Sequence, residues 1–175
     1  MDLKRAVALT ERPPESCTGQ WPSKGILMII FVPVCIKEII AKGRDFPWPR
    51  PGECPRCNGR RVWGHGFVPA FFDGYSCQVF LRRYRCPDCH CVLRLRPLGY
   101  FKRFQAPIEK IRSSIAYRLR NGRWPPSLSR ARQGHWLRSL YRKTLAYFGQ
   151  GWKARLLDGF DCLSRINEVP VSRRI

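Results

Sequence analysis

The amino-acid sequence predicts an α+β protein: a small antiparallel ribbon, a basic helix-turn-helix-like segment after it, and a short strand–helix unit before it. Three observations support this fold class. Two Cys-x-x-Cys pairs bracket a strand-rich stretch, an apolar β-branched run precedes them, and the hydrophobic period changes from two to about 3.6 residues after Gly99. The predicted segments are a disordered or misassigned extension at 1–27, a strand, helix and proline-rich connector at 28–53, the ribbon at 54–100, the basic helices at 101–168 and a tail at 169–175.

The N-terminal unit is predicted from local composition. The run IIFVPV at 29–34 is apolar and rich in β-branched residues, as buried strands are, and CIKEIIAKG at 35–43 favours a short helix closed by its glycine. Three prolines make 44–53 a stiff extended connector, and we expect its Phe46 and Trp48 to pack against the chain that it crosses. This unit therefore contributes one strand and one helix.

The sequence also bears on where the chain begins and where it works. Residues 1–27 have mixed charge, three prolines and no sustained period, and Met28 directly precedes the strand, so we hypothesise that translation starts there. Mass spectrometry of natively expressed protein beginning at Met1 would contradict this. The most apolar run, 25–36, is shorter than the about 20 residues that span a membrane. Nine cysteines, an odd number with no secretory signal before them, indicate a reducing, cytoplasmic setting.

The ribbon is predicted from short strands around a hairpin signal. FVPAFF at 67–72 meets Asp73-Gly74, and SCQVFLRRYR at 76–85 returns the chain to the second cysteine pair. CVLRLR at 91–96 alternates apolar and basic residues, which is typical of an edge strand with one solvent face. The expected ribbon is antiparallel.

The cysteine spacing is C-x2-C-x28-C-x2-C, formed by Cys54, Cys57, Cys86 and Cys89. Each pair closes a tight turn that presents two sulfurs to one ion, and a hairpin brings the two turns together. Four thiolates around Zn²⁺ form a closed tetrahedral structural site with no position open for water or substrate. The spacing therefore predicts a structural zinc ribbon. Two disulfides, a redox pair or separate buried thiols stay open as alternatives, as do His90 and Cys91 as replacement ligands.

The charge of the chain points to a polyanionic partner. The formal net charge is +21, from 33 basic and 12 acidic residues, and 25 of the basic residues are arginine. The excess is concentrated in 101–157, which carries 14 Lys and Arg against the single acid Glu109. Arginine binds two phosphate oxygens at once through its planar fork, so this composition favours nucleic acid.

Three helices are predicted after residue 100. Pro107 suits a first helical position, and helices are expected at 107–120, 129–148 and about 152–166. On the second helix the apolar residues Leu137, Leu140, Tyr141, Leu145 and Phe148 gather on one side, and His135, Arg138, Ser139, Arg142 and Lys143 on the other. The first two helices form a helix-turn-helix-like pair, although their connection is about eight residues rather than three or four. An amphipathic helix pair that only packs a tail onto the ribbon remains the alternative.

Residues that reach phosphates and base edges gather on the second helix. They are Arg130, Arg132, Gln133, His135, Arg138, Arg142 and Lys143. Because a helix N-terminus can enter a major groove, these residues predict binding of double-stranded DNA. Two other functions remain open: a protein-interaction adaptor, and RNA binding in which Tyr75, Phe80 and Tyr84 stack bases.

No catalytic constellation is evident. A metal nuclease needs several converging acids, and residues 101–175 contain four, Glu109, Asp158, Asp161 and Glu168. Ser/His/Asp patterns and glycine-rich phosphate loops are absent from the sequence, and no small-molecule substrate is indicated. We therefore expect a protein that is not an enzyme.

Three motifs carry a resemblance. With DFPWPRPGECPRC, RRYRCPDC and RFQAPIEKIR…GRWPPSLSRARQGHWLR, residues 28–155 resemble an uncharacterised bacterial family of small proteins of unassigned function. The layout is also similar to the zinc-ribbon and helix-turn-helix front ends of insertion-sequence transposases and their accessory proteins. That similarity implies that the four cysteines bind the metal and that the helix near 130–142 reads element DNA, in a regulator or accessory of a mobile element with a transposase or other protein as partner. The long helix connection and the lack of a catalytic domain depart from that pattern.

Overall fold

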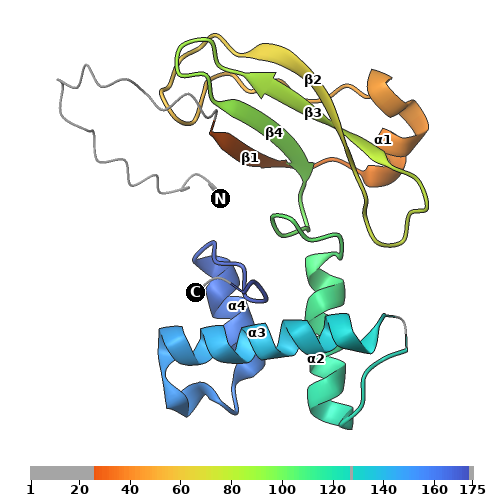
Figure 1. Cartoon of the computed structure of the whole chain (residues 1–175), viewed down its shortest axis with the longest axis vertical. Coiled ribbons are helices and arrows are strands. Elements are labelled where there is room, and N and C mark those ends of the chain that lie inside the picture. Colours follow the sequence, from red (N-terminus) through yellow and green to blue (C-terminus); the bar gives the residue numbers. More distant parts are fainter. Residues whose placement is uncertain (1–25, 127, 174–175) are drawn as a thin grey trace, which may run out of the picture.

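The computed structural model describes residues 26–126 and 128–173. Figure 1 shows a four-stranded sheet at one end of the molecule and three helices at the other, which confirms the α+β class. The predicted extension at 1–27 lies outside the described residues except for its last two, and so do the last two residues of the predicted tail at 169–175.

The sheet has the order β1-β4-β3-β2, formed by β1 (Leu27–Val32), β2 (Trp63–Ala70), β3 (Val79–Arg85) and β4 (Val92–Pro97). The pairs β2–β3 and β3–β4 are antiparallel, but β1 is parallel to β4. The sheet is therefore mixed, and β4 is a central strand; the expectation of a purely antiparallel ribbon with an edge strand at 91–96 is wrong. The reason is long-range: the apolar β1 pairs along the open edge of β4, and the strand ends before Pro33, which has no N–H to donate.

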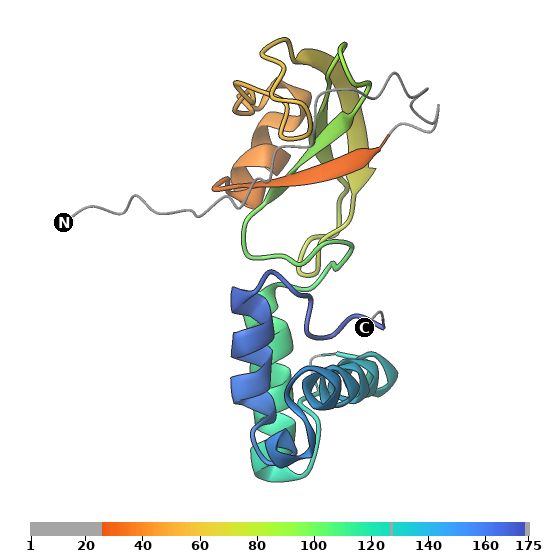
Figure 2. The same ribbon diagram turned by 90° about the vertical axis from the view of Figure 1, so that its left-hand side faces the viewer.

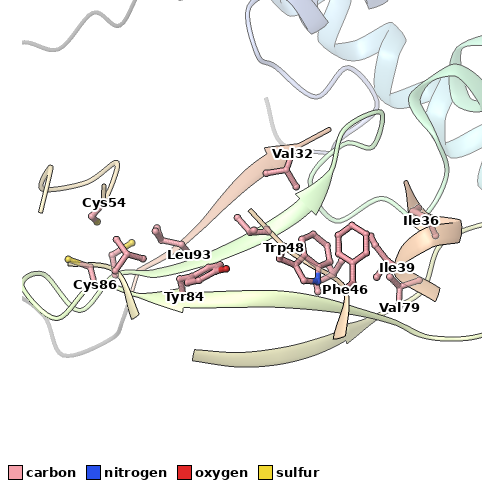
Figure 3. Packing of buried hydrophobic residues seen from close by; sticks show 14 of the residues in the cluster. Val32, Ile36, Ile39, Phe46, Trp48, Cys54, Val79, Tyr84, Cys86 and Leu93 are labelled. Carbon is pink, nitrogen blue, oxygen red and sulfur yellow. The ribbon is translucent and has the colours of Figure 1, made fainter. Parts of the chain in front are cut away.

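One face of the sheet is covered by the segment that follows β1. Helix α1 (Ile36–Lys42) and the 3-10 turn η1 (Gly43–Asp45) lie against it, and Phe46 and Trp48 pack edge to face with ring centroids 5.2 Å apart. Both rings are buried, as predicted for the connector. Figure 3 shows this core with Ile36 and Ile39 of α1 at one end and Cys54 and Cys86 at the other.

The helical region consists of α2 (Ile108–Asn121), α3 (Arg130–Phe148), the 3-10 turn η2 (Gln150–Trp152) and α4 (Leu156–Arg165). The sequence predicted each of the three α-helices to within a few residues. Helix α2 ends at Gly122 in the left-handed conformation, and Ser129 caps α3 by accepting a hydrogen bond from the N–H of Arg132. Figure 2 shows α3 nearly end-on beside α2 and α4, so α3 crosses the other two helices.

The buried face of α3 differs from the predicted one. Its buried residues are Gln133, Trp136, Ser139, Leu140, Lys143 and Thr144, whereas Tyr141 is exposed. The core-facing side is thus turned by about one residue around the helix axis from the predicted apolar side. This orientation of α3 also explains why residue 159 of α4 is a glycine, because a Cβ there would lie 2.7 Å from the side chain of Thr144.

The sheet and helical regions are joined by polar contacts. The carboxylate of Asp73, in the β2–β3 connection, accepts from Arg132 of α3 at 2.9 Å, and its backbone N–H donates to the carbonyl of Gln105. Arg96 of β4 stacks over the Phe72 ring and donates to the carbonyl of Phe104. The segment between β4 and α2 is therefore tied to both regions.

Candidate metal centre and nucleic-acid interface

The two Cys-x-x-Cys pairs form matching turns. After the first pair the chain turns back through Asn58 (φ 56°), and after the second through His90 (φ 57°), both in the left-handed conformation. The first turn closes with the N–H of Asn58 donating to the Cys54 carbonyl at 2.8 Å, and the second with the N–H of Cys86 donating to the carbonyl of Cys91 at 3.0 Å. The second turn therefore links the end of β3 to the start of β4.

The structure brings the four predicted sulfurs together. All four Sγ atoms lie within 4.8 Å of one another, and the Cys54–Cys89 and Cys57–Cys86 separations are both 3.6 Å. A tetrahedron of Zn–S bonds of about 2.3 Å has edges of about 3.8 Å, so the sulfurs stand close to the positions that such an ion requires. This cluster, with Cys54 and Cys86 fully buried, could hold a metal ion such as zinc.

The alternative ligands lie differently. The imidazole Nδ1 of His90 is 3.3 Å from the guanidinium of Arg85, and the buried thiol of Cys91 donates to the carbonyl of Ile26 at 3.3 Å. Each has a partner outside the sulfur cluster. The spacing is also tight at Gly59, where a Cβ would require the Asp88 carboxylate to move.

Burial and mutual hydrogen bonds shift the pKa values of the clustered thiols. Burial raises the pKa of the Cys57 thiol to about 12, and it raises the pKa of Cys89 as well. Burial acts in the same direction on Cys54, but hydrogen bonds from the backbone N–H groups of Arg56 and Cys57 outweigh it and lower the pKa of Cys54. A bound cation would stabilise the charged thiolates that burial disfavours.

Two arginines make contacts beside the cluster. Arg56 donates to the carbonyl of Cys89 at 3.3 Å, and Arg61 pairs with the carboxylate of Asp88 at 2.7 Å. Both contacts connect the two cysteine turns to each other. The arginines therefore stabilise the turns as well as compensate charge.

Three of the residues predicted to contact nucleic acid have other roles. Gln133 is fully buried: its amide N–H groups donate to the carbonyls of Pro125 and Leu128, and its carbonyl accepts from Ser114. Lys143 is 2% exposed and donates to Glu168, Ser172 and the carbonyl of Val169. Arg132 is partly buried against Asp73. The prediction that Gln133 and Lys143 lie on a ligand-binding surface is therefore corrected, because both side chains are buried and bonded to partners within the protein.

The other four predicted residues remain accessible. Arg130, Arg138 and Arg142 are exposed on the side of α3 opposite the core, and His135 is half-buried beside them. Burial lowers the pKa of His135, and the nearby charges of Arg173, Arg138 and Arg142 lower it further. The imidazole is therefore held neutral inside a cationic field.

Sequence reasoning missed an apolar groove on the same surface. Leu119 of α2, Leu137 and Tyr141 of α3 and Leu156 of α4 line it, with Arg138 and Arg142 at its rim. Of the predicted apolar side of α3, Leu140 lies in the core, whereas Leu137 and Tyr141 line this groove. The only sign of this groove in the sequence was Leu119, which continues the apolar spacing of α2. In the structure its side chain is 45% exposed.

Comparisons of the chain with protein-family models, curated proteins and solved structures found no match. The resemblance drawn from the sequence motifs thus gains no family assignment, and what it implies for α3 stays a prediction. Within 26–126 and 128–173, none of the helices has the length and apolar character needed to cross a membrane.

Proposed function

We propose that this protein binds nucleic acid, that the exposed face of α3 contacts double-stranded DNA, and that a structural Zn²⁺ held by the four cysteines stabilises the sheet region. When bound, the ion supplies a rigid cross-link between the two cysteine turns. A site with four thiolate ligands serves structure rather than chemistry, so we propose a binding protein rather than an enzyme. The layout shared with transposase front ends makes a mobile-element regulator or accessory the role to test.

The observation that carries the proposal is the unneutralised charge of α3. Three of the four acids in the helical region are already paired, Asp161 with Arg112, Glu168 with Lys143 and Asp158 with Arg155. Among the ion pairs of the described residues, none includes Arg130, Arg138 or Arg142. These three arginines are thus available to phosphates.

The shape of the helix supports the same use. Its exposed face carries the small residues Ala131 and Gly134 in its N-terminal half, and its first turn contains no acid. Small side chains let a helix approach a groove closely, and the positive end of the helix dipole favours phosphate. Helix α2, which crosses α3 and packs on it through Ser114 and Gln133, holds it in place.

The test is duplex binding as a function of salt. In the double variant R138A/R142A, we expect the affinity for duplex DNA to fall about ten-fold or more and the slope of log affinity against log salt to decrease by about two, one unit for each phosphate contact. Fluorescence anisotropy with a labelled duplex measures both quantities.

A control of equal charge separates the surface from the overall charge. Lys37 and Lys42 are exposed on α1, on the covered side of the sheet, and K37A/K42A removes the same two charges. If both double variants weaken binding equally, the protein attracts DNA by net charge alone and the assignment of α3 is wrong.

The groove beside α3 favours a second candidate function. Leu137 and Tyr141 between two arginines suit an acidic amphipathic helix of a protein partner. Because Arg138 and Arg142 serve both ligands, such a partner would compete with DNA. Y141A should lower the affinity for the protein partner and leave the affinity for duplex DNA unchanged, which distinguishes an adaptor from a DNA-binding protein.

A further inference from the structure

The sheet has a second face, which α1 does not cover (Figure 2). Residues that pair across neighbouring strands share a face, so the strand register identifies its members. One row runs Leu27, Val92, Arg85, Trp63 across all four strands. We call this the open face of the sheet.

The next rows of the open face are rich in arginine. Ile29, Arg94 and Arg83 are paired across β1, β4 and β3. Phe31 pairs with Arg96, which is itself buried against Phe72 and Phe104. The opposite face is occupied by Arg82 and Tyr84, which lie in one cavity with Phe46 and Trp48 of the connector. The alternation along β3 therefore separates Arg83 and Arg85, on the open face, from Arg82, on the covered one.

Large apolar groups on the open face remain accessible. Trp63 is 58% exposed at the β2 edge, and Leu27 and Phe31 are 41% and 39% exposed at the β1 edge. The aromatics that the sequence suggests for stacking bases are placed differently: Tyr84 is buried, and Phe80 lies under the guanidinium of Arg44. On the open face of the sheet, the exposed rings that can stack bases are those of Trp63 and Phe31.

Among the ion pairs of residues 26–126 and 128–173, none includes Arg83, Arg85 or Arg94. Arg83 and Arg94 are directly opposite each other, and their Nε atoms are buried without a hydrogen-bond partner. Burial and the neighbouring Arg83 both lower the pKa of Arg94. Like charges opposed across strands destabilise a sheet unless an anion lies between them, and the four strands contain no acidic residue.

We propose that the open face of the sheet is a binding surface for single-stranded nucleic acid, in which Trp63 and Phe31 stack bases and Arg83, Arg85 and Arg94 bind the phosphates between them. Alternating cations and exposed rings on an open sheet are the features that bind single strands without sequence preference. Trp63 lies three strand spacings of about 4.8 Å from Leu27, and Phe31 lies four residues of about 3.3 Å further along β1, so the edge rings are about 20 Å apart, a span of a few nucleotides. This surface is separate from α3, so it does not depend on α3 binding duplex DNA.

The metal centre fixes one end of this surface. Arg85 precedes Cys86 by one residue, and the guanidinium of Arg85 is held at the nitrogen of His90 in the second cysteine turn. Trp63 lies directly across from Arg85 on β2. The cross-link that joins the cysteine turns therefore also sets the position of the ring and the first phosphate ligand.

The experiment compares labelled single strands of about 12 nucleotides, one of DNA and one of RNA, with a labelled duplex, using the full chain loaded with zinc. In W63A and in R83Q/R94Q we expect single-strand affinity to fall about ten-fold, with duplex binding changed less than two-fold. R138A/R142A should show the reverse pattern. Failure of this proposal and failure of the role of α3 are thus seen in different variants.

Matched controls remove an aromatic ring or two positive charges outside the open face of the sheet. F71A deletes a ring that is 56% exposed in the β2–β3 connection, and K37A/K42A deletes two charges from the covered side. Neither should change single-strand affinity. Binding of the DNA strand or the RNA strand supports the proposal, and the ratio between them tells which source of single strand is preferred.

Thermal unfolding distinguishes a loss of binding from a loss of stability. R83Q removes one of two opposed charges, so the free protein should unfold at an equal or higher temperature while its single-strand affinity falls. If W63A and R83Q/R94Q bind single strands as the parent protein does, the proposal is overturned. It is equally overturned if polyglutamate displaces the strand as well as an unlabelled strand does, because the face would then serve acidic proteins.

Discussion

The sheet region and the helical region stabilise their cores in opposite ways. In the helical region the buried Lys143 has three hydrogen-bond partners, and Gln133 bridges α2 to the connection before α3. In the sheet region the buried groups are instead four cysteine thiols, whose thiolate forms require a cation, and the Nε atoms of Arg83 and Arg94, which have no hydrogen-bond partner among the described residues. The buried charge of the helical core is thus paired within that region, whereas these groups of the sheet region are not.

This difference indicates which region of the molecule depends on bound ligands. A buried polar group without an intramolecular partner costs free energy, so it persists where an outside partner supplies the missing contact. The sheet region contains two such groups, four sulfurs whose thiolate forms need a cation and an opposed arginine pair that has no acidic partner among the described residues. The helical region places its deficit on the exposed surface of α3, where water satisfies it. The sheet region should therefore respond far more strongly to what is bound.

Metal removal should have the largest effect, and it should act on the sheet region alone. In Cys86→Ser, or with excess chelator, we expect the sheet region to unfold while α2, α3 and α4 stay helical, because metal binding contributes on the order of 10 kcal/mol to folding in small zinc modules. Hydrogen exchange resolved by segment measures the two regions separately. Cys35→Ser and Cys77→Ser, at exposed thiols, are the controls. Protected amides in β3 and β4 after complete metal removal would contradict the prediction.

Lys143 offers the converse change, confined to the helical region. Lys143→Met keeps the volume of the side chain but removes the donor to Glu168, Ser172 and the carbonyl of Val169. We expect the free energy of unfolding to fall by about 2 kcal/mol, since the carboxylate left behind is partly exposed and can be hydrated. Urea unfolding followed by helical circular dichroism measures the change.

The matched control for this variant is Lys153→Met, at an exposed lysine of the same region. It should leave the stability unchanged. Metal affinity should be equal in both variants, because neither residue lies near the cysteines. An unchanged urea midpoint in Lys143→Met would mean that the buried ammonium contributes nothing to the helical core.

Much of the fold could be predicted because its signals are local. The C-x2-C pairs identified the four cysteines, and the 3.6-residue period located α2, α3 and α4. The parallel pairing of β1 with β4 could not be predicted, because nothing in either strand encodes a partner more than 60 residues away. That pairing is also what makes the alternating arginines of β4 central rather than peripheral.

The candidate site was predicted in part for a related reason. Apolar periodicity marks the core side of a helix only when the core is apolar, and on α3 Gln133, Ser139 and Lys143 are buried. Their partners Ser114 and Glu168 lie elsewhere in the chain, so the sequence around α3 suggested a solvent face instead. The spacing of Trp136, Leu140 and Thr144, four residues apart, was the signal for the correct face.

Acid should have the smallest effect, confined to two ion pairs of the helical region. Hydrogen bonds from Arg112 lower the pKa of Asp161, and those from Lys143 lower the pKa of Glu168. A carboxyl whose pKa is lowered on folding stabilises the fold above its unfolded pKa, and this contribution is lost as the pH falls through the folded value. The helical region should therefore lose stability below about pH 4, by less than about 1 kcal/mol per pair because both carboxylates are more than a third exposed.

Two variants test this prediction. In Arg112→Met the loss of stability that comes from Asp161 should disappear, whereas Arg155→Met, at a more exposed pair, should retain that loss. Hydrogen exchange of the α2 and α4 amides between pH 7 and pH 3.5 reads the helices without the metal centre, and an equal acid response in both variants would mean that the Arg112–Asp161 pair adds no stability.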